Sequence, residues 1–88
     1  MVIVKKKDIG DALLIETYCE MHQIKEKIRF FQGKYQQNFE DFSESMKNNE
    51  EDFEQFDDYI EWKAYQKVYH ETIQKIEDLK SGNFQVTQ

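Results

Sequence analysis

The sequence predicts an all-α protein: an antiparallel hairpin of two long helices with a short helix between them. Three observations lead to this prediction. Apolar residues recur at helical spacings over two long segments, the 88 residues contain no proline, and the only glycines are Gly10, Gly33 and Gly82. No linker divides the chain, so we expect a single helical domain over residues 1–88, with helices at about 11–32, 38–47 and 57–80.

The first long helix is predicted from its apolar face. Residues on this face recur at spacings of four, three, seven and three; they are Leu14, Tyr18, Met21, Ile28 and Phe31. The residues that widen the face are Ile15, Cys19 and Ile24. Gly33 is suited to the left-handed conformation that often follows the last residue of a helix, so we expect this helix to end just before it.

The second long helix carries a strict repeat with alternating steps of three and four. The residues of this repeat are Trp62, Tyr65, Tyr69, Thr72, Ile76 and Leu79. Asp58, followed by Glu61, matches an N-terminal capping pattern, and Asp57 also suits the positive end of the helix dipole. Lys80 suits the opposite end, and Gly82 follows as the residue beyond the helix.

A shorter helix is predicted between the two. Asn38 is a good N-cap, and Phe39, Phe42 and Met46 then fall on one side, with Tyr35 extending that stripe backwards. The chain ends, "MVIVK" and "NFQVT", favour extended structure and predict possible short terminal strands.

The two long helices have matched lengths of roughly 33–36 Å, which favours an antiparallel pair. A hairpin of two helices leaves outer apolar side chains in contact with water. We therefore expect a homodimer with a four-helix core, a higher homo-oligomer, or a different partner protein that supplies the missing surface.

Negative charge is concentrated in one part of the chain. The net charge is −6, yet residues 40–58 alone contain nine acidic residues and one lysine. This distribution disfavours nucleic-acid binding and favours a protein partner with a basic surface. No apolar run approaches the ~20 residues of a membrane span, and the single Cys19 excludes an internal disulfide, so we expect a cytoplasmic protein that does not enter a membrane.

No motif for catalysis or for metal binding is evident. Cys19 and His22 are three residues apart but lack a second ligand pair, and His70 is the only other histidine. There is no glycine-rich phosphate loop and no Glu-x-x-His motif. We expect no enzyme activity, no catalytic residue, no metal site and no cofactor.

The segment "FEQFDDYIEWKAY", residues 53–65, combines five aromatic rings with four carboxylates. Its rings either face the core beneath a solvated loop or contact a partner protein. Aromatic residues often dominate binding energy, and carboxylates steer a basic partner. The predicted partner-binding residues are Phe53, Phe56, Asp57, Asp58, Tyr59, Glu61 and Trp62.

The order "KYQQNFEDF", an acidic loop, "DDYIEWKAY" and "KIEDLKSGNFQVT" resembles short acidic all-helical antitoxin-like proteins of bacteria and archaea. Those proteins are commonly encoded beside a small toxin-like protein. The resemblance covers about residues 34–87, and its most recognisable part is the run at residues 57–65. It implies a non-catalytic protein that neutralises a basic toxin-type partner. This chain has no evident basic domain for binding an operator, so direct DNA binding is not expected.

Two other functions remain open at this stage. The first is a self-assembling structural helical protein with no toxin partner, in which the aromatic stripe is the core of a homo-oligomer. The second is a metal-binding bundle, with carboxylates from Glu16, Glu20 and Glu71 converging in the interior.

Overall fold

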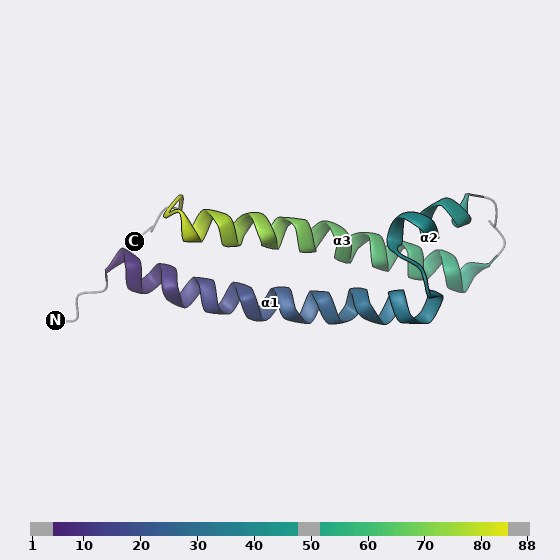
Figure 1. The fold of residues 1–88 in the computed structure, drawn as a ribbon, viewed down its shortest axis with the longest axis horizontal. Helices are drawn as coiled ribbons and strands as arrows, with labels where there is room; N and C mark the ends of the chain where they lie inside the picture. Colours follow the sequence, from purple (N-terminus) through teal and green to yellow (C-terminus); the bar gives the residue numbers. More distant parts are fainter. Residues whose placement is uncertain (1–4, 48–51, 85–88) are drawn as a thin grey trace.

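The computed structural model describes residues 5–47 and 52–84, and over these ranges the chain forms three helices. The long helices α1 (Lys6–Tyr35) and α3 (Phe53–Lys80) lie side by side and antiparallel, while the short α2 (Phe39–Met46) packs against α3 near its N-terminal end (Figure 1). The molecule is a rod of 62 × 19 × 18 Å. The predicted helical hairpin is therefore confirmed.

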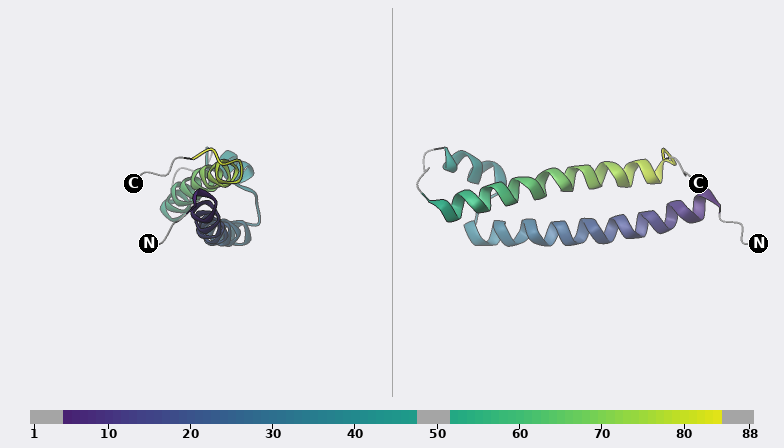
Figure 2. Two further views of the ribbon diagram at one scale, coloured as in Figure 1. Left: turned by 90° about the vertical axis from the view of Figure 1, so that its left-hand side faces the viewer. Right: turned by 180° about the vertical axis from the view of Figure 1, so that it is seen from behind.

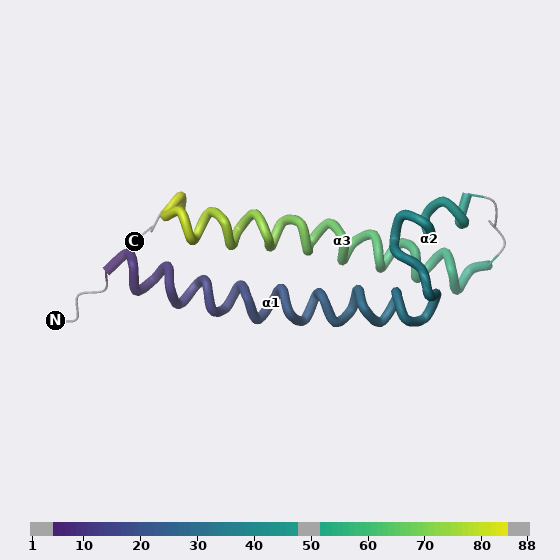
Figure 3. The backbone as a smooth tube through the Cα atoms, viewed as in Figure 1, coloured from purple at the N-terminus to yellow at the C-terminus, as the bar shows by residue number. Residues whose placement is uncertain are grey.

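The path of the chain explains how α2 covers one end of the hairpin. After α1 the backbone crosses to α2 in a short connection, and α3 then returns along the whole length of α1 (Figure 3). The views from the end and from behind show the two long helices side by side along the rod, with α2 confined to one end (Figure 2). The two described chain ends lie together at the opposite end of the rod (Figure 1).

The contact between the long helices is a regular seam with alternating steps of three and four. Every seam position on α1 is buried or half-buried; these positions are Gly10, Leu14, Thr17, Met21, Ile24, Ile28, Phe31 and Tyr35. The corresponding positions on α3 are Asp58, Trp62, Tyr65, Tyr69, Thr72, Ile76 and Leu79. The repeat predicted for α3 is thus the face that meets α1, in the packing mode of coiled coils.

On α1 the predicted face is displaced from the observed one. Ile15 is 67 % exposed, and Tyr18 and Cys19 are also exposed, so these three residues lie outside the seam. Thr17 occupies the seam instead and is fully buried. Its hydroxyl donates to the carbonyl of Leu13 one turn earlier at 2.7 Å, which satisfies the buried polar group within its own helix.

An aromatic cluster fills the end of the rod where α2 lies. We use this name for Phe31 and Tyr35 of α1, Phe39 and Phe42 of α2, and Tyr59 and Trp62 of α3. The indole of Trp62 is fully buried at the centre, with ring-centroid distances of 5.2 Å to Phe42, 5.5 Å to Phe39 and 5.6 Å to Phe31. Trp62, which belongs to α3, thereby contacts both α1 and α2 and holds α2 against the hairpin.

The start of α2 agrees with the prediction. The side chain of Asn38 accepts a hydrogen bond from the backbone N–H of Asp41 at 2.8 Å, as expected of an N-cap. Phe42 and Met46 are buried and Phe39 is half-buried, so the apolar side of α2 faces the aromatic cluster.

The end of α1 differs from the prediction. The helix continues through Gly33 to Tyr35, and Gln36 adopts the left-handed conformation with φ of 52°. Gly33 is exposed with no atom within 4 Å of an added Cβ, so nothing requires the chain to turn there. Stacking of Tyr35 on Phe42 at 4.2 Å stabilises the additional turn. α1 also begins earlier than expected, at Lys6 rather than near residue 11.

The start of α3 also differs from the prediction. Asp52 is the N-cap, its side chain accepts from the backbone N–H of Gln55, and the helix begins at Phe53. Asp58 therefore lies inside the helix, and the predicted capping pair with Glu61 is wrong. The physical reason is that the carboxylate of Asp58 is occupied by side chains of α1.

The C-terminal end of α3 agrees with the prediction. Gly82 has a left-handed φ of +74°, and Lys80 lies in the last turn. The ring of Phe84 then covers Gly10 of α1, where an added Cβ would lie 2.9 Å from the ring. The predicted terminal strands fall mainly on residues 1–4 and 85–88, which lie outside the described residues, and the described part of the chain contains no strand.

Candidate functional site

The acidic–aromatic segment, residues 53–65, forms the N-terminal half of α3. Because a helix turns about 100° per residue, its five rings point in different directions. Trp62 and Tyr65 lie in the seam, Tyr59 is half-buried, and Phe53 and Phe56 are exposed. Some rings of the segment therefore belong to the core and others to the surface. The core interpretation applies to the first group, and the partner-binding interpretation can apply only to the second.

Of the predicted partner-binding rings, Trp62 belongs to the core. It has no exposed surface, and rings of α1 and α2 pack against its indole. Tyr59 stacks on Phe39 at 5.8 Å and keeps part of its ring accessible. A partner that leaves this fold intact would contact Tyr59 but would not reach Trp62.

Phe53 and Phe56 are the most unusual side chains of the segment. Phe53 is 81 % exposed and Phe56 is 48 % exposed, although each is large and apolar. Single exposed apolar residues are common on proteins, but two aromatic rings one turn apart are a contiguous apolar feature.

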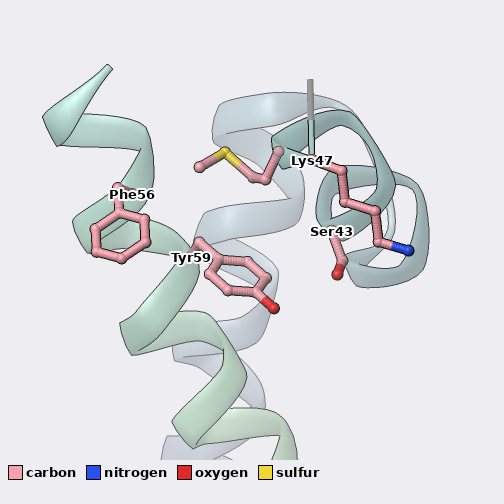
Figure 4. A pocket seen from close by; sticks show the side chains of 5 residues that line it. Ser43, Lys47, Phe56 and Tyr59 are labelled. Atoms are coloured by element: carbon pink, nitrogen blue, oxygen red, sulfur yellow. The ribbon is translucent and has the colours of Figure 1, made fainter. Parts of the chain in front are cut away.

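A groove lies between α2 and the N-terminal half of α3. It has a volume of about 400 Å³ and is lined by Ser43, Met46, Lys47, Phe56 and Tyr59. The ring of Tyr59 lies between Phe56 on α3 and Ser43 on α2 (Figure 4). The buried Met46 contributes apolar surface to the lining. We call this feature the α2–α3 groove; its dimensions suit one or two apolar side chains of another molecule.

Asp58 joins α1 to α3 through a small charged cluster. Its carboxylate accepts hydrogen bonds from Lys34 at 2.6 Å and from the hydroxyl of Tyr35. Lys34 also pairs with Glu54 at 3.0 Å. Burial pushes the pKa of Asp58 upward, but the hydrogen bonds from Lys34 and Tyr35 outweigh it and hold that pKa below its ordinary value.

The same cluster changes the pKa values of its other two members. Burial, together with the hydrogen bond to Asp58, raises the pKa of the Tyr35 hydroxyl to about 12. Hydrogen bonds to Asp58 and Glu54 raise the pKa of Lys34. At neutral pH the carboxylate of Asp58 is therefore ionised, while Tyr35 and Lys34 are protonated, as their hydrogen bonds require. These hydrogen bonds link α1 to α3.

The remaining predicted carboxylates face water. Asp57 and Glu61 are exposed, and Glu61 accepts a hydrogen bond from the hydroxyl of Tyr65 at 3.3 Å. Burial, with the nearby charge of Glu61, raises the pKa of Tyr65. On α2, Glu40 and Glu44 are exposed on the same side of the helix, four residues apart. Exposed carboxylates thus lie on both helices that border the α2–α3 groove.

Sequence reasoning missed a second, largely apolar stripe on α3. Phe53, Phe56, Ile60, Ala64 and Lys67 follow one another at steps of three, four, four and three, and all five are exposed. We call this set the outer stripe, because it lies on the side of α3 roughly opposite the seam. The helical spacing from Phe53 to Ile60 was the available signal. This spacing was not recognised, because the longer repeat that starts at Trp62 was interpreted as the apolar face of the helix.

The alternative metal-binding bundle finds no support in the placement of its carboxylates. Glu16, Glu20 and Glu71 are all exposed, so they do not converge in the interior. Within residues 5–47 and 52–84, no group of three or more His, Cys, Asp and Glu side chains is arranged to hold a metal ion. Cys19 and His22 are both exposed on α1.

Comparisons with known protein families, with curated proteins and with solved structures gave no match for this chain. None of the helices in the described part of the chain is both long enough and apolar enough to cross a membrane. The function is therefore argued from the surface of the molecule itself.

Proposed function

We propose that this protein is a non-catalytic interaction module that binds a basic protein partner at the α2–α3 groove. In this proposal it acts as the neutralising half of a toxin–antitoxin-like pair, as its resemblance to antitoxin-like proteins implies. Direct binding of nucleic acid is not part of the proposal.

The observation that carries this proposal is the exposure of two aromatic rings on α3, one of which, Phe56, lines the α2–α3 groove. Phe53 and Phe56 remain in water, although the aromatic cluster a few residues away buries comparable rings. Exposed rings beside a concave apolar surface are typical of protein-binding sites, where an inserted side chain gains most of the binding energy.

Charge supports a basic partner. The helices bordering the groove carry exposed carboxylates at Glu40, Glu44 and Asp57, within a segment of strongly negative charge. Opposite charge on the partner would accelerate encounter and discriminate against acidic proteins. Lys47 lines the groove but is paired with Glu44 at 3.2 Å, so its positive charge is partly compensated.

We also propose that two copies form the homodimer expected from the sequence. The hairpin leaves large apolar side chains such as Ile15, Phe30 and Ile60 exposed, and the chain has only a small core of its own. Pairing of two copies is a common way for small helical domains to bury such surface.

The partner-binding proposal is tested by affinity capture from the native host, followed by mass spectrometry and binding titration of the captured protein. In Ser43→Phe a ring is added inside the groove, whereas Ser45→Phe adds the same ring to the exposed side of α2. We expect the first variant to weaken binding at least about tenfold, because it fills the site, and the second to leave binding unchanged.

A charge-matched pair of variants tests the role of the acidic surface. Glu40→Lys with Glu44→Lys reverses two exposed carboxylates of α2, one of the two helices that border the groove. Glu16→Lys with Glu20→Lys makes the same change, at the same spacing, on exposed positions of α1. We expect only the first double variant to lose affinity, by about tenfold at low salt. Equal binding by both double variants would remove the groove from the proposal.

A growth assay tests the neutralising role itself. The captured partner is expressed in a bacterial host alone, with the wild-type protein, and with the Ser43→Phe variant. We expect the partner alone to arrest growth, the wild type to restore it, and the variant to fail. Normal growth with the partner alone would leave an interaction module but reject the antitoxin-like role.

A further inference from the structure

We draw no further inference here: the strongest candidate, the exposed outer stripe of α3, carries none, because nothing in the described part of the structure shows what covers it and its Phe53 and Phe56 already belong to the proposed partner site.

Discussion

The two ends of the rod are built differently. At the α2 end, three helices enclose the aromatic cluster around Trp62. At the terminal end, only α1 and α3 meet, and their seam contains Gly10, Thr17, Thr72 and Ile76. Large rings fill the space between three helices, whereas small and β-branched residues allow two helices to approach closely.

The two ends are therefore expected to contribute unequally to the stability of this 88-residue chain. A core needs enclosure on several sides, and only the α2 end provides it. The terminal end gains apolar contact on one face of each helix, together with Phe84 on Gly10 and the hydrogen bond from Lys6 to the carbonyl of Gly82 at 3.1 Å. We therefore expect most of the free energy of unfolding to depend on the α2 end.

Replacement of Trp62 should give the largest effect. Trp62→Ala should lower the free energy of unfolding by roughly 3–5 kcal/mol, because it empties the centre of three helices. Ile76→Ala, at the terminal end, should cost about 2 kcal/mol, since fewer atoms surround the deleted group. Urea titrations followed by circular dichroism measure both. A larger cost for Ile76→Ala would reverse the comparison between the two ends.

Trp62→Phe is the matched variant that keeps the cluster aromatic. The indole N–H of Trp62 has no hydrogen-bond partner among the described residues, so its removal leaves no acceptor unpaired. We expect a cost of about 1–2 kcal/mol from the lost volume alone. A cost close to that of Trp62→Ala would mean that the indole N–H bonds to a group outside residues 5–47 and 52–84.

Amide hydrogen exchange should resolve the two ends in the unmodified protein. Amides near Thr17 and Ile76 should exchange through local opening, with an opening free energy about 1–2 kcal/mol below that of amides near Phe31 and Trp62. The physical reason is that opening the terminal end separates two helices, whereas opening the α2 end exposes the whole aromatic cluster. Uniform protection along α1 and α3 would show that the rod unfolds as one unit.

Asp58→Asn should have a smaller effect that depends on pH. The pKa of Asp58 is lowered by folding, so its stabilising contribution is present above the ordinary aspartate pKa of about 4 and is lost as pH falls through the lower folded value. The partly exposed Lys34 limits the cost at neutral pH to about 1 kcal/mol. The variant should therefore lose less stability than wild type as pH falls below the ordinary aspartate pKa.

Asp57→Asn is the control for this titration. Asp57 is exposed, and no ion pair within residues 5–47 and 52–84 involves it, so its removal should leave the acid unfolding curve of the monomer unchanged. If both variants flatten the curve equally, a general effect of net charge, rather than the cluster with Lys34 and Tyr35, would explain the pH dependence.

The smallest effect is expected at the threonines of the seam. The hydroxyl of Thr17 bonds only to a carbonyl of its own helix, so Thr17→Val removes a buried polar group without leaving an unpaired partner. We expect the free energy of unfolding to stay the same or to rise by up to about 1 kcal/mol. Thr17→Ser, which keeps the hydroxyl and deletes the methyl group, should lower it by about 1 kcal/mol. Thermal unfolding compares the two variants.

Much of the fold could be predicted from local patterns. The seam of α3 and the N-cap at Asn38 were recognisable, because each depends on residues close together in sequence. The ends of α1 and the start of α3 could not be predicted, because distant contacts determine them. Tyr35 extends α1 by packing on α2. Asp58 does not cap α3, because its carboxylate accepts a hydrogen bond from Lys34.

The candidate site was predictable only in part. Composition indicated an aromatic and acidic segment, but only the placement of α2 distinguishes the buried Trp62 from the exposed Phe53. Met46 and Ser43 line the groove as a consequence of how α2 packs against α3. The seam position of Thr17 was missed because the sequence reasoning followed apolar residues and passed over a β-branched polar one.

The position of Trp62 also provides an optical reporter of the fold. It is the only tryptophan in the chain, and its indole is fully buried against rings of α1 and α2. Its fluorescence should be blue-shifted in the folded protein and should move to longer wavelength when α2 detaches or the hairpin opens. Self-association that leaves the three helices packed should leave this emission unchanged. One unlabelled residue can therefore tell a change of structure from a change of assembly.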